Sequence, residues 1–182
     1  MDLALMQADI TSVCLYETLG EESFEYIVKE TNLTALCCSV ENLSTIFKYK
    51  RAGKLSILKS IVCFDSVSAS ANEMAKELAL DIFEFSSLVS LGKNLQLSLK
   101  HATRSSLYTL AYTSGTTSLP KGVMISQENA VAKSTVWMDN GYQFSENDTH
   151  LSYLRLVHIL ERSLLMISYT YGVKVGFAQG DL

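Results

Sequence analysis

The most informative stretch of this sequence is residues 107–125, LYTLAYTSGTTSLPKGVMI. Residues 107–112 predict a strand, the polar residues 113–118 predict a loop, and residues 123–125 predict another short strand. The hydroxyl and backbone N–H groups of such a loop can bind phosphate oxygens, and the ammonium of Lys121 can neutralise their charge. The stretch therefore predicts a phosphate-binding loop at the end of a strand.

This loop differs from two familiar phosphate-binding motifs. A P-loop requires a second glycine five positions after the first, with four residues between them, followed directly by Lys and Ser or Thr. Counted from Gly115, Pro120 stands where that second glycine belongs, and Gly122 follows Lys121. The loop does not contain GxGxxG either. The alternative interpretation is a Ser/Thr-rich surface turn that happens to contain Pro-Lys-Gly.

Upstream, short apolar runs alternate with amphipathic segments. The expected strands are 13–16, 33–39, 60–64 and 82–85, and the expected helices are 24–31, 43–53 and 71–78. This βαβαβαβ series predicts an α/β fold, a parallel sheet layered with flanking helices. Sheets of this kind bind ligands at the carboxyl ends of their strands.

Downstream, local signals predict two helices and a last strand. Ser126 can cap a helix that runs to about Met138. A longer, mostly apolar helix is expected from about His158 to Tyr171, with Gly172 as its stop. Residues 173–177 predict a strand, whereas residues 91–104 have weak periodicity and predict a connection.

The composition excludes several classes of protein. The 182 residues are 48% hydrophobic and carry a net charge of −4, which favours a globular protein and argues against non-specific nucleic-acid binding. No apolar run is long enough to cross a bilayer as a helix. No linker or repeat marks an internal domain boundary. The four cysteines form no CxxC pair, and we expect buried free thiols in a reducing compartment (Cys14, Cys37, Cys38 and Cys63).

The spacing of TSGTTSLPKGV closely resembles the signature of the adenylate-forming superfamily, which includes acyl-CoA synthetases, luciferases and peptide-synthetase adenylation domains. Four flanking segments are similar to long-chain fatty acyl-CoA synthetases and occur in that family's order. They are YETLG at 16–20, SLG at 90–92, SYLRLVHILER at 152–162 and GFAQGD at 176–181. The resemblance spans nearly the whole chain and implies part of the large N-terminal, AMP-binding domain.

The resemblance implies a site and a reaction. A fatty acid carboxylate would attack the α-phosphate of ATP and release pyrophosphate, and the thiol of coenzyme A would then displace AMP. Mg²⁺ would bridge phosphate oxygens, with Thr116 as one ligand. The residues implied to hold the ATP phosphates are Thr113, Ser114, Gly115, Thr116, Thr117, Ser118 and Lys121.

The segment 152–162 leaves alternatives open. The resemblance places His158 near the acyl carboxylate, but a lone histidine at the start of an apolar helix is often a packing residue. Glu161 and Arg162 fit the same motif, although an adjacent acid–base pair is commonly a solvated patch. Core packing is favoured over an acyl tunnel for four further side chains (Tyr153, Leu160, Leu164 and Leu165).

This sequence also departs from the family pattern. Ser118 replaces the glycine of TSGTTG, at a cost of about 1–3 kcal/mol if that position needs positive φ. Arg155 replaces a proline, and Val157 and Leu160 replace an alanine and a phenylalanine. The chain is expected to begin inside the first domain and to lack the C-terminal domain with its catalytic lysine.

Three functional hypotheses follow from the resemblance. The first is a long-chain fatty acid–CoA ligase, or an internal fragment of one. The second is a catalytically inactive module that binds nucleotide or associates with a complementing polypeptide. The third is a sibling adenylate-forming enzyme with another acid substrate. We expect an intracellular protein, and the family's association with membranes of the endoplasmic reticulum or peroxisome leaves peripheral membrane association open.

Overall fold

The structure of the protein is a computed structural model that describes residues 1–16, 19–96, 98, 100–113 and 119–178. The chain divides into two compact units. Met1–Glu17 and Leu99–Leu182 form the first, called here the terminal unit. Thr18–Ser98 form the second, called the inserted unit. The sequence has no linker and no change in composition at either boundary, so it does not predict this division.

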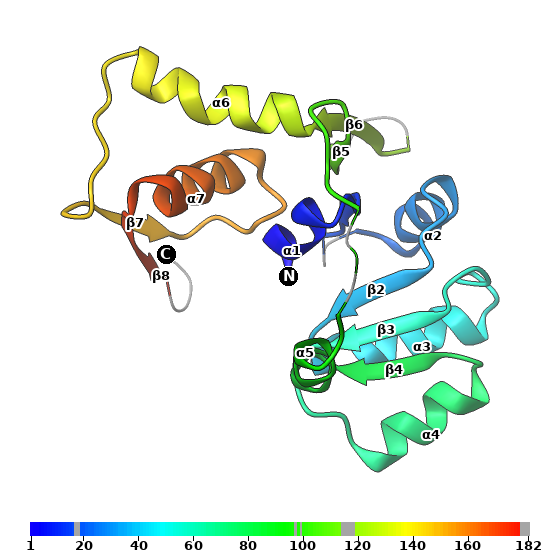
Figure 1. Ribbon diagram of the computed structural model, residues 1–182. Coiled ribbons are helices and arrows are strands. Elements are labelled where there is room, and N and C mark those ends of the chain that lie inside the picture. The colour runs from blue at the N-terminus through cyan, green and yellow to red at the C-terminus, as the bar shows by residue number, and fades with distance from the viewer. Residues whose placement is uncertain (17–18, 97, 99, 114–118, 179–182) are drawn as a thin grey trace. The chain divides into compact units, whose positions relative to one another are not determined.

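The inserted unit is built on a parallel sheet of three strands (Figure 1). Its strands are β2 (Ala35–Cys38), β3 (Ser60–Cys63) and β4 (Asp81–Glu84), in the order β2-β3-β4. All neighbours run parallel, with Cys38 opposite Cys63. The predicted parallel α/β arrangement is confirmed for these strands.

Helices connect the strands of the inserted unit. They are α2 (Glu21–Glu30), the 3-10 helix η1 (Val40–Asn42), α3 (Leu43–Arg51), α4 (Ala69–Glu77) and α5 (Phe85–Lys93). In α2, the apolar side chains of Ile27 and Val28 are buried. Helix α4 begins at a cap in which the Ser68 hydroxyl accepts a hydrogen bond from the Ala71 N–H, at 3.2 Å. Helix α5 was not predicted, because residues 91–104 were interpreted as a connection.

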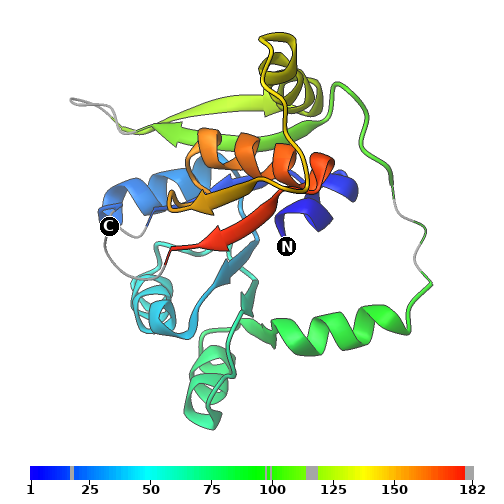
Figure 2. The same ribbon diagram turned by 90° about the vertical axis from the view of Figure 1, so that its left-hand side faces the viewer.

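The terminal unit contains a second sheet, with the strand order β1-β5-β6. Its strands are β1 (Ser12–Cys14), β5 (Leu107–Thr113) and β6 (Lys121–Ser126). Strand β1 runs parallel to β5, and β5 and β6 form a long antiparallel hairpin (Figure 2). The prediction that the first strand opens the same sheet as the next three is therefore wrong. Local periodicity cannot reveal a partner strand almost a hundred residues away.

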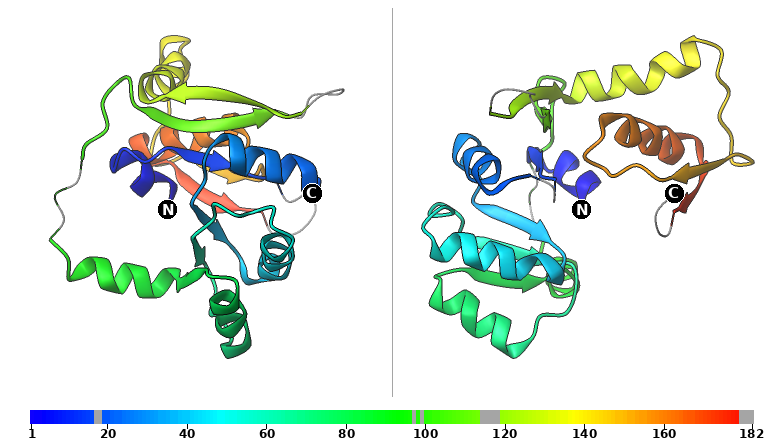
Figure 3. Two further views of the ribbon diagram at one scale, coloured as in Figure 1. Left: turned by 90° about the vertical axis from the view of Figure 1, so that its right-hand side faces the viewer. Right: turned by 180° about the vertical axis from the view of Figure 1, so that it is seen from behind.

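The remaining elements of the terminal unit are α1 (Asp2–Gln7), α6 (Gln127–Asp139), β7 (Thr149–Ser152), α7 (Ile159–Tyr171) and β8 (Lys174–Phe177). Strands β7 and β8 pair in parallel, as a strand–helix–strand crossover requires. Helices α6 and α7 run side by side (Figure 3). Elements α1 and β7 were not predicted.

Two predicted helix ends in the terminal unit are confirmed. The Ser126 hydroxyl accepts a hydrogen bond from the Asn129 N–H at 3.1 Å, and the Asn129 side chain accepts one from the Ser126 N–H at 3.2 Å. At the end of α7, Gly172 adopts φ +71°, a left-handed conformation that glycine adopts without steric strain. Both signals are local, which is why the sequence sufficed to place them.

Candidate functional site

The β5–β6 hairpin holds the two ends of the predicted phosphate-binding loop together. Thr113 is the last residue of β5, Lys121 is the first residue of β6, and the two are direct partners across the hairpin. Both are exposed. The hairpin therefore brings an exposed hydroxyl and an exposed ammonium group together at its loop end. The other five predicted phosphate ligands, Ser114, Gly115, Thr116, Thr117 and Ser118, lie outside the described residues.

A close contact in the next cross-strand pair supports this end of the hairpin. Tyr112 is buried and is the partner of Gly122. A methyl group added at Gly122 would lie 3.0 Å from the Cζ atom of the Tyr112 ring. Only a glycine at position 122 leaves room for the Tyr112 ring to cover β6. This packed pair is next to the pair of Thr113 and Lys121.

His158 is the exposed residue that precedes α7. Its backbone N–H donates to the Arg155 carbonyl at 2.9 Å, which closes a turn just before the helix. Its ring contacts the ring of Tyr16 edge-on. The structure thus brings together two segments that the resemblance singled out, the one beginning at Tyr16 and the one containing His158.

Arg162 lies at the centre of a buried polar cluster in the terminal unit, and only 6% of it is exposed. Its Nε donates to the Leu156 carbonyl at 2.7 Å, and its Nη1 donates to Asp2 at 2.8 Å. Nη1 also donates to the Ser12 hydroxyl at 3.4 Å, and Nη2 donates to the Cys14 sulfur at 2.7 Å. One guanidinium therefore joins the segment before α7 to α1 and β1.

Tyr108 completes this cluster from β5. Its hydroxyl donates to the second carboxylate oxygen of Asp2 at 2.7 Å, and the Arg162 guanidinium lies 5.2 Å from its ring centre. Burial and the bond to Asp2 raise the pKa of the Tyr108 hydroxyl well above its usual range. Burial by itself lowers the pKa of Arg162, but Cys14, Asp2 and Tyr108 outweigh it and raise that pKa. Arg162 is therefore a permanent buried cation.

Glu161 is buried completely on the same helix. Its Oε1 lies 3.0 Å from Nε2 of His150 on β7, and its Oε2 has no hydrogen-bond partner among the residues the structure describes. The interpretation of Glu161 and Arg162 as a solvated patch is therefore wrong. Both side chains point into the terminal unit: Glu161 contacts His150 on β7, and Arg162 contacts residues of α1 and β1.

The expected core role of the neighbouring apolar side chains is confirmed only in part. Leu165 is 6% exposed and belongs to the core, and Leu164 is half-buried. Tyr153 and Leu160 are 58% and 42% exposed, so the prediction that they are core residues is wrong. Tyr153 precedes the turn at Arg155, where no regular periodicity assigns a face.

The cysteines also differ from expectation. All four are free, but only Cys38 and Cys63 are buried, whereas Cys37 is exposed and Cys14 is half-buried. Alternate residues of β2 face opposite sides of the sheet, so Cys37 and Cys38 cannot share an environment. Among the described residues, no group of three or more His, Cys, Asp or Glu side chains could hold a metal ion. Nor does that part of the chain contain a helix long and apolar enough to cross a membrane.

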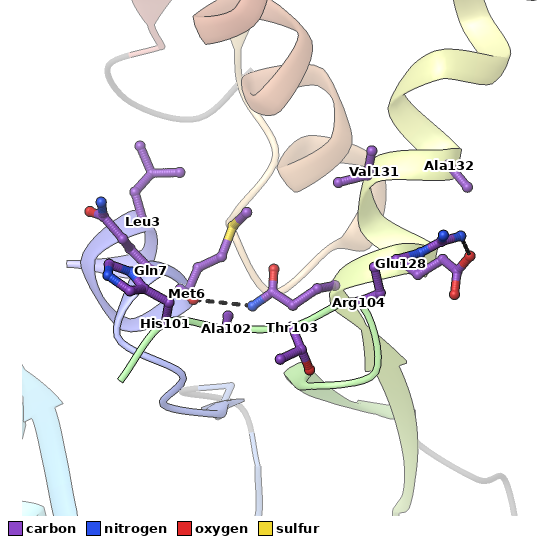
Figure 4. Close-up of a pocket in the computed structure, with 11 residues that line it drawn as sticks. Leu3, Met6, Gln7, His101, Ala102, Thr103, Arg104, Glu128, Val131 and Ala132 are labelled. Carbon is purple, nitrogen blue, oxygen red and sulfur yellow. Dashed lines mark hydrogen bonds and ion pairs between the residues drawn. The ribbon is translucent and has the colours of Figure 1, made fainter. Parts of the chain in front are cut away.

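A separate pocket of about 830 Å³ opens elsewhere in the terminal unit (Figure 4). It lies between α1, residues 101–104 and the first turns of α6, with Leu3, Met6 and Val131 on its walls. Gln127 crosses one side and donates to the Met6 carbonyl at 3.2 Å. None of the predicted site residues that the structure describes, Thr113, Lys121 and His158, lines this pocket.

The family model described as AMP-binding enzyme matches residues 1–182. The chain belongs to the AMP-binding enzyme family. The resemblance inferred from TSGTTSLPKGV and its flanking segments is thereby confirmed. The match covers both the terminal and the inserted unit.

Curated members of the AMP-binding family include similar proteins. Fatty acyl-CoA synthetase B of Dictyostelium discoideum is 34% identical over 172 residues, which cover 93% of this chain and 25% of that protein. The peroxisomal Long chain acyl-CoA synthetase 7 of Arabidopsis thaliana is 29% identical over 182 residues, which cover 100% of this chain and 26% of that protein. The chain spans about a quarter of the length of each.

A solved structure shows the same fold. It is the A domain of carboxylic acid reductase from Segniliparus rugosus in complex with AMP and a co-purified carboxylic acid, with a TM-score of 0.81 and 22% identity. The match covers 99% of this chain and 31% of that chain. This AMP-binding family chain therefore has the α/β fold of part of an adenylation domain.

Proposed function

We propose that this chain forms the phosphate-binding part of an ATP-dependent long-chain fatty acid–CoA ligase. The observation that carries the proposal is the pairing of Thr113 with Lys121 at the loop end of the β5–β6 hairpin, in a chain whose family is AMP-binding. The names of the similar acyl-CoA synthetases support the substrate class. The protein as a whole would occur inside the cell, and the name of the Arabidopsis relative supports a peroxisome among its locations.

In this proposal, the hairpin end acts by positioning and charge neutralisation. The ammonium of Lys121 binds the ATP phosphates, and the Thr113 hydroxyl donates to a phosphate oxygen. Residues 114–118 supply further hydroxyl and N–H groups to the same phosphates. Thr116 would help to hold the Mg²⁺ that ATP carries, and this ion would supply charge neutralisation at the phosphate oxygens. Electrostatic stabilisation of this kind lowers the barrier to displacement at phosphorus.

The reaction then proceeds in two displacements. A fatty acid carboxylate oxygen attacks the α-phosphorus, and pyrophosphate leaves to give an acyl-adenylate. The thiol of coenzyme A next attacks the acyl carbon, and AMP leaves. His158 is exposed and its ring contacts that of Tyr16; in this proposal it lies near the acyl carboxylate. No described residue of this chain is assigned the role of general acid for either step.

The alternative is a catalytically inactive chain that binds nucleotide or associates with a complementing polypeptide. Exposed apolar side chains on β6 and α6 favour this reading. Val123 and Met124 on β6 are 50% and 69% exposed, and Val131 and Val136 on α6 are also exposed. Apolar surface of this kind often marks a protein interface. A complementing polypeptide would supply the remainder of the catalytic domain.

The test uses two readouts on the purified, folded chain. Calorimetric titration with Mg-ATP measures nucleotide affinity, and fatty-acid-dependent exchange of labelled pyrophosphate into ATP measures adenylation. Removing a charged hydrogen bond weakens affinity by about 10- to 100-fold, so Lys121→Ala should lose that much. Lys174→Ala, which removes an exposed lysine from β8, is the matched control and should bind normally.

The outcomes separate the two functions. Exchange that depends on fatty acid and on Lys121 supports the ligase. Mg-ATP binding that depends on Lys121 without exchange supports the inactive nucleotide-binding alternative. Equal ATP affinity in the wild type, Lys121→Ala and Lys174→Ala would contradict any role of the hairpin end in phosphate binding.

A further inference from the structure

Arg162 carries a buried positive charge, and the proposed mechanism gives this side chain no task. Leaving a cation buried is expensive unless its donors are satisfied, and here each guanidinium nitrogen has an acceptor. The acceptors lie on three separate segments of the terminal unit. Packing of α7 alone would not require a side chain that bonds to three segments.

The first segment that Arg162 holds is the turn that carries His158. Its Nε donates to the carbonyl of Leu156, which lies inside the turn closed by the bond from His158 N–H to Arg155 carbonyl. Leu156 is itself exposed, so its side chain does not anchor the turn to the core. The bond from Arg162 therefore ties this exposed turn to a buried group.

The other two segments, α1 and β1, both contact strand β5, which ends at Thr113. The Asp2 carboxylate accepts from Arg162 with one oxygen and from the Tyr108 hydroxyl of β5 with the other. Ser12 and Cys14 lie on β1, which pairs in parallel with β5. Arg162 thus fixes the His158 turn against β5, the strand that carries Thr113 at the loop end of the hairpin.

We propose that Arg162 is a positioning residue, which sets the place of His158 relative to β5 through the planar fork of its guanidinium. Its donors point in fixed directions toward Leu156, Asp2 and Cys14, and a lysine ammonium on a flexible stem cannot satisfy all three. The contacts of Arg162 do not depend on the proposed function. Its catalytic meaning rests on the proposed function, in which His158 lies near the acyl carboxylate.

The test compares Arg162→Met and Arg162→Lys with Leu165→Ala, using nuclear magnetic resonance without nucleotide. Leu165 is a buried residue of the same helix, so Leu165→Ala reports general loosening of α7. The probes are hydrogen exchange of the His158 amide, which is bonded to the Arg155 carbonyl, and the chemical shifts of the His158 ring, which contacts Tyr16. Amides late in α7, such as Thr170, serve as internal references.

We expect exchange of the His158 amide to rise by about 10- to 100-fold in both Arg162 variants, with the His158 ring shifts changed and the Thr170 amide little affected. In Leu165→Ala, exchange should rise along the whole helix while the ring shifts stay. If Arg162→Met fails to fold, Asp2→Asn gives the same test, since it removes the charge that orients Nη1.

Two results would overturn the inference. One is an unchanged His158 amide and ring in folded Arg162 or Asp2 variants. The other is a change that matches Leu165→Ala, which would make Arg162 an ordinary packing residue. A full return of both signals to wild-type values in Arg162→Lys would also contradict the role of the fork.

Pyrophosphate exchange links the inference to catalysis. If the wild type is active, Arg162→Lys should lower kcat by about tenfold or more with the KM for ATP within about twofold, because the phosphate ligands are untouched. If the wild type shows no pyrophosphate exchange, that result counts against the ligase proposal alone. The resonance measurements would still decide whether Arg162 positions His158.

Discussion

The ring of Tyr16 meets the ring of His158 edge-on, with ring centres 6.0 Å apart and planes inclined at 74°. The contact joins the chain just after β1 to the residue that precedes α7. An edge-to-face pair of this kind contributes about 0.5–1.5 kcal/mol beyond the area it buries. Tyr16 therefore limits the motion of a histidine that is otherwise exposed.

Tyr16→Leu should release the His158 ring. Because the aromatic edge contact is lost, we expect the His158 ring proton resonances to move toward the values of an unstructured histidine. Tyr142→Leu is a matched control, since Tyr142 contacts Trp137 and Phe144 in a different aromatic cluster. If both variants leave the His158 resonances unchanged, the Tyr16 contact does not restrain the ring in solution.

Gly122→Ala should destabilise the terminal unit. The added methyl group would lie 3.0 Å from the Tyr112 ring, and crowding of this kind costs about 1–3 kcal/mol of unfolding free energy. Trp137, the one tryptophan of the chain, reports unfolding of this unit by fluorescence during denaturant titration. Gly176→Ala in β8, where an added methyl group meets nothing within 4 Å, is the control. Equal losses in the two variants would show that the Tyr112 contact is not the cause.

The pair of His150 and Glu161 should be strongly coupled. His150→Ala leaves the fully buried Glu161 carboxylate without its partner, and removing one member of a buried pair costs about 3–5 kcal/mol of unfolding free energy. Glu161→Gln added to His150→Ala should recover much of this loss, because the buried charge is gone. A double-mutant cycle followed by Trp137 fluorescence measures the coupling. Additive losses would indicate that the two side chains do not interact.

Alkaline pH should destabilise the inserted unit through Cys38. Burial, with smaller contributions from Cys63, Cys37 and Asp65, raises the pKa of the Cys38 thiol from 9.0 to about 12. Above pH 9 the unfolded chain loses this proton while the folded chain keeps it, so the contribution is complete below pH 9 and is lost between pH 9 and about 12.

Denaturant titrations of the inserted unit, followed by circular dichroism at several pH values, can detect this loss. Cys38→Ala should flatten the decline in stability between pH 9 and 12. Val28→Ala, a truncation of another buried side chain in the same unit, should lower stability at every pH and keep the slope. The same alkaline slope in Cys38→Ala as in the wild type would assign the decline to other groups.

Local signals in the sequence predicted much of this protein. Apolar periodicity placed the strands β2, β3 and β4 with their helices, and Ser126 and Gly172 marked helix ends that the structure confirms. The spacing of TSGTTSLPKGV identified the family, because its hydroxyls, glycine and lysine stand close together in the chain and can be read as one motif. Each of these features depends on neighbours within a few residues.

Only the tertiary structure decided where the terminal unit buries its charges. Arg162 contacts Asp2, Ser12 and Cys14 near the start of the chain. Glu161 contacts His150 on β7. An adjacent acid and base look alike in sequence whether they face water or the core. The partners of Arg162 on β1 lie where β1 pairs with β5 across almost a hundred residues, and no local pattern encodes the chain closure that brings those segments together.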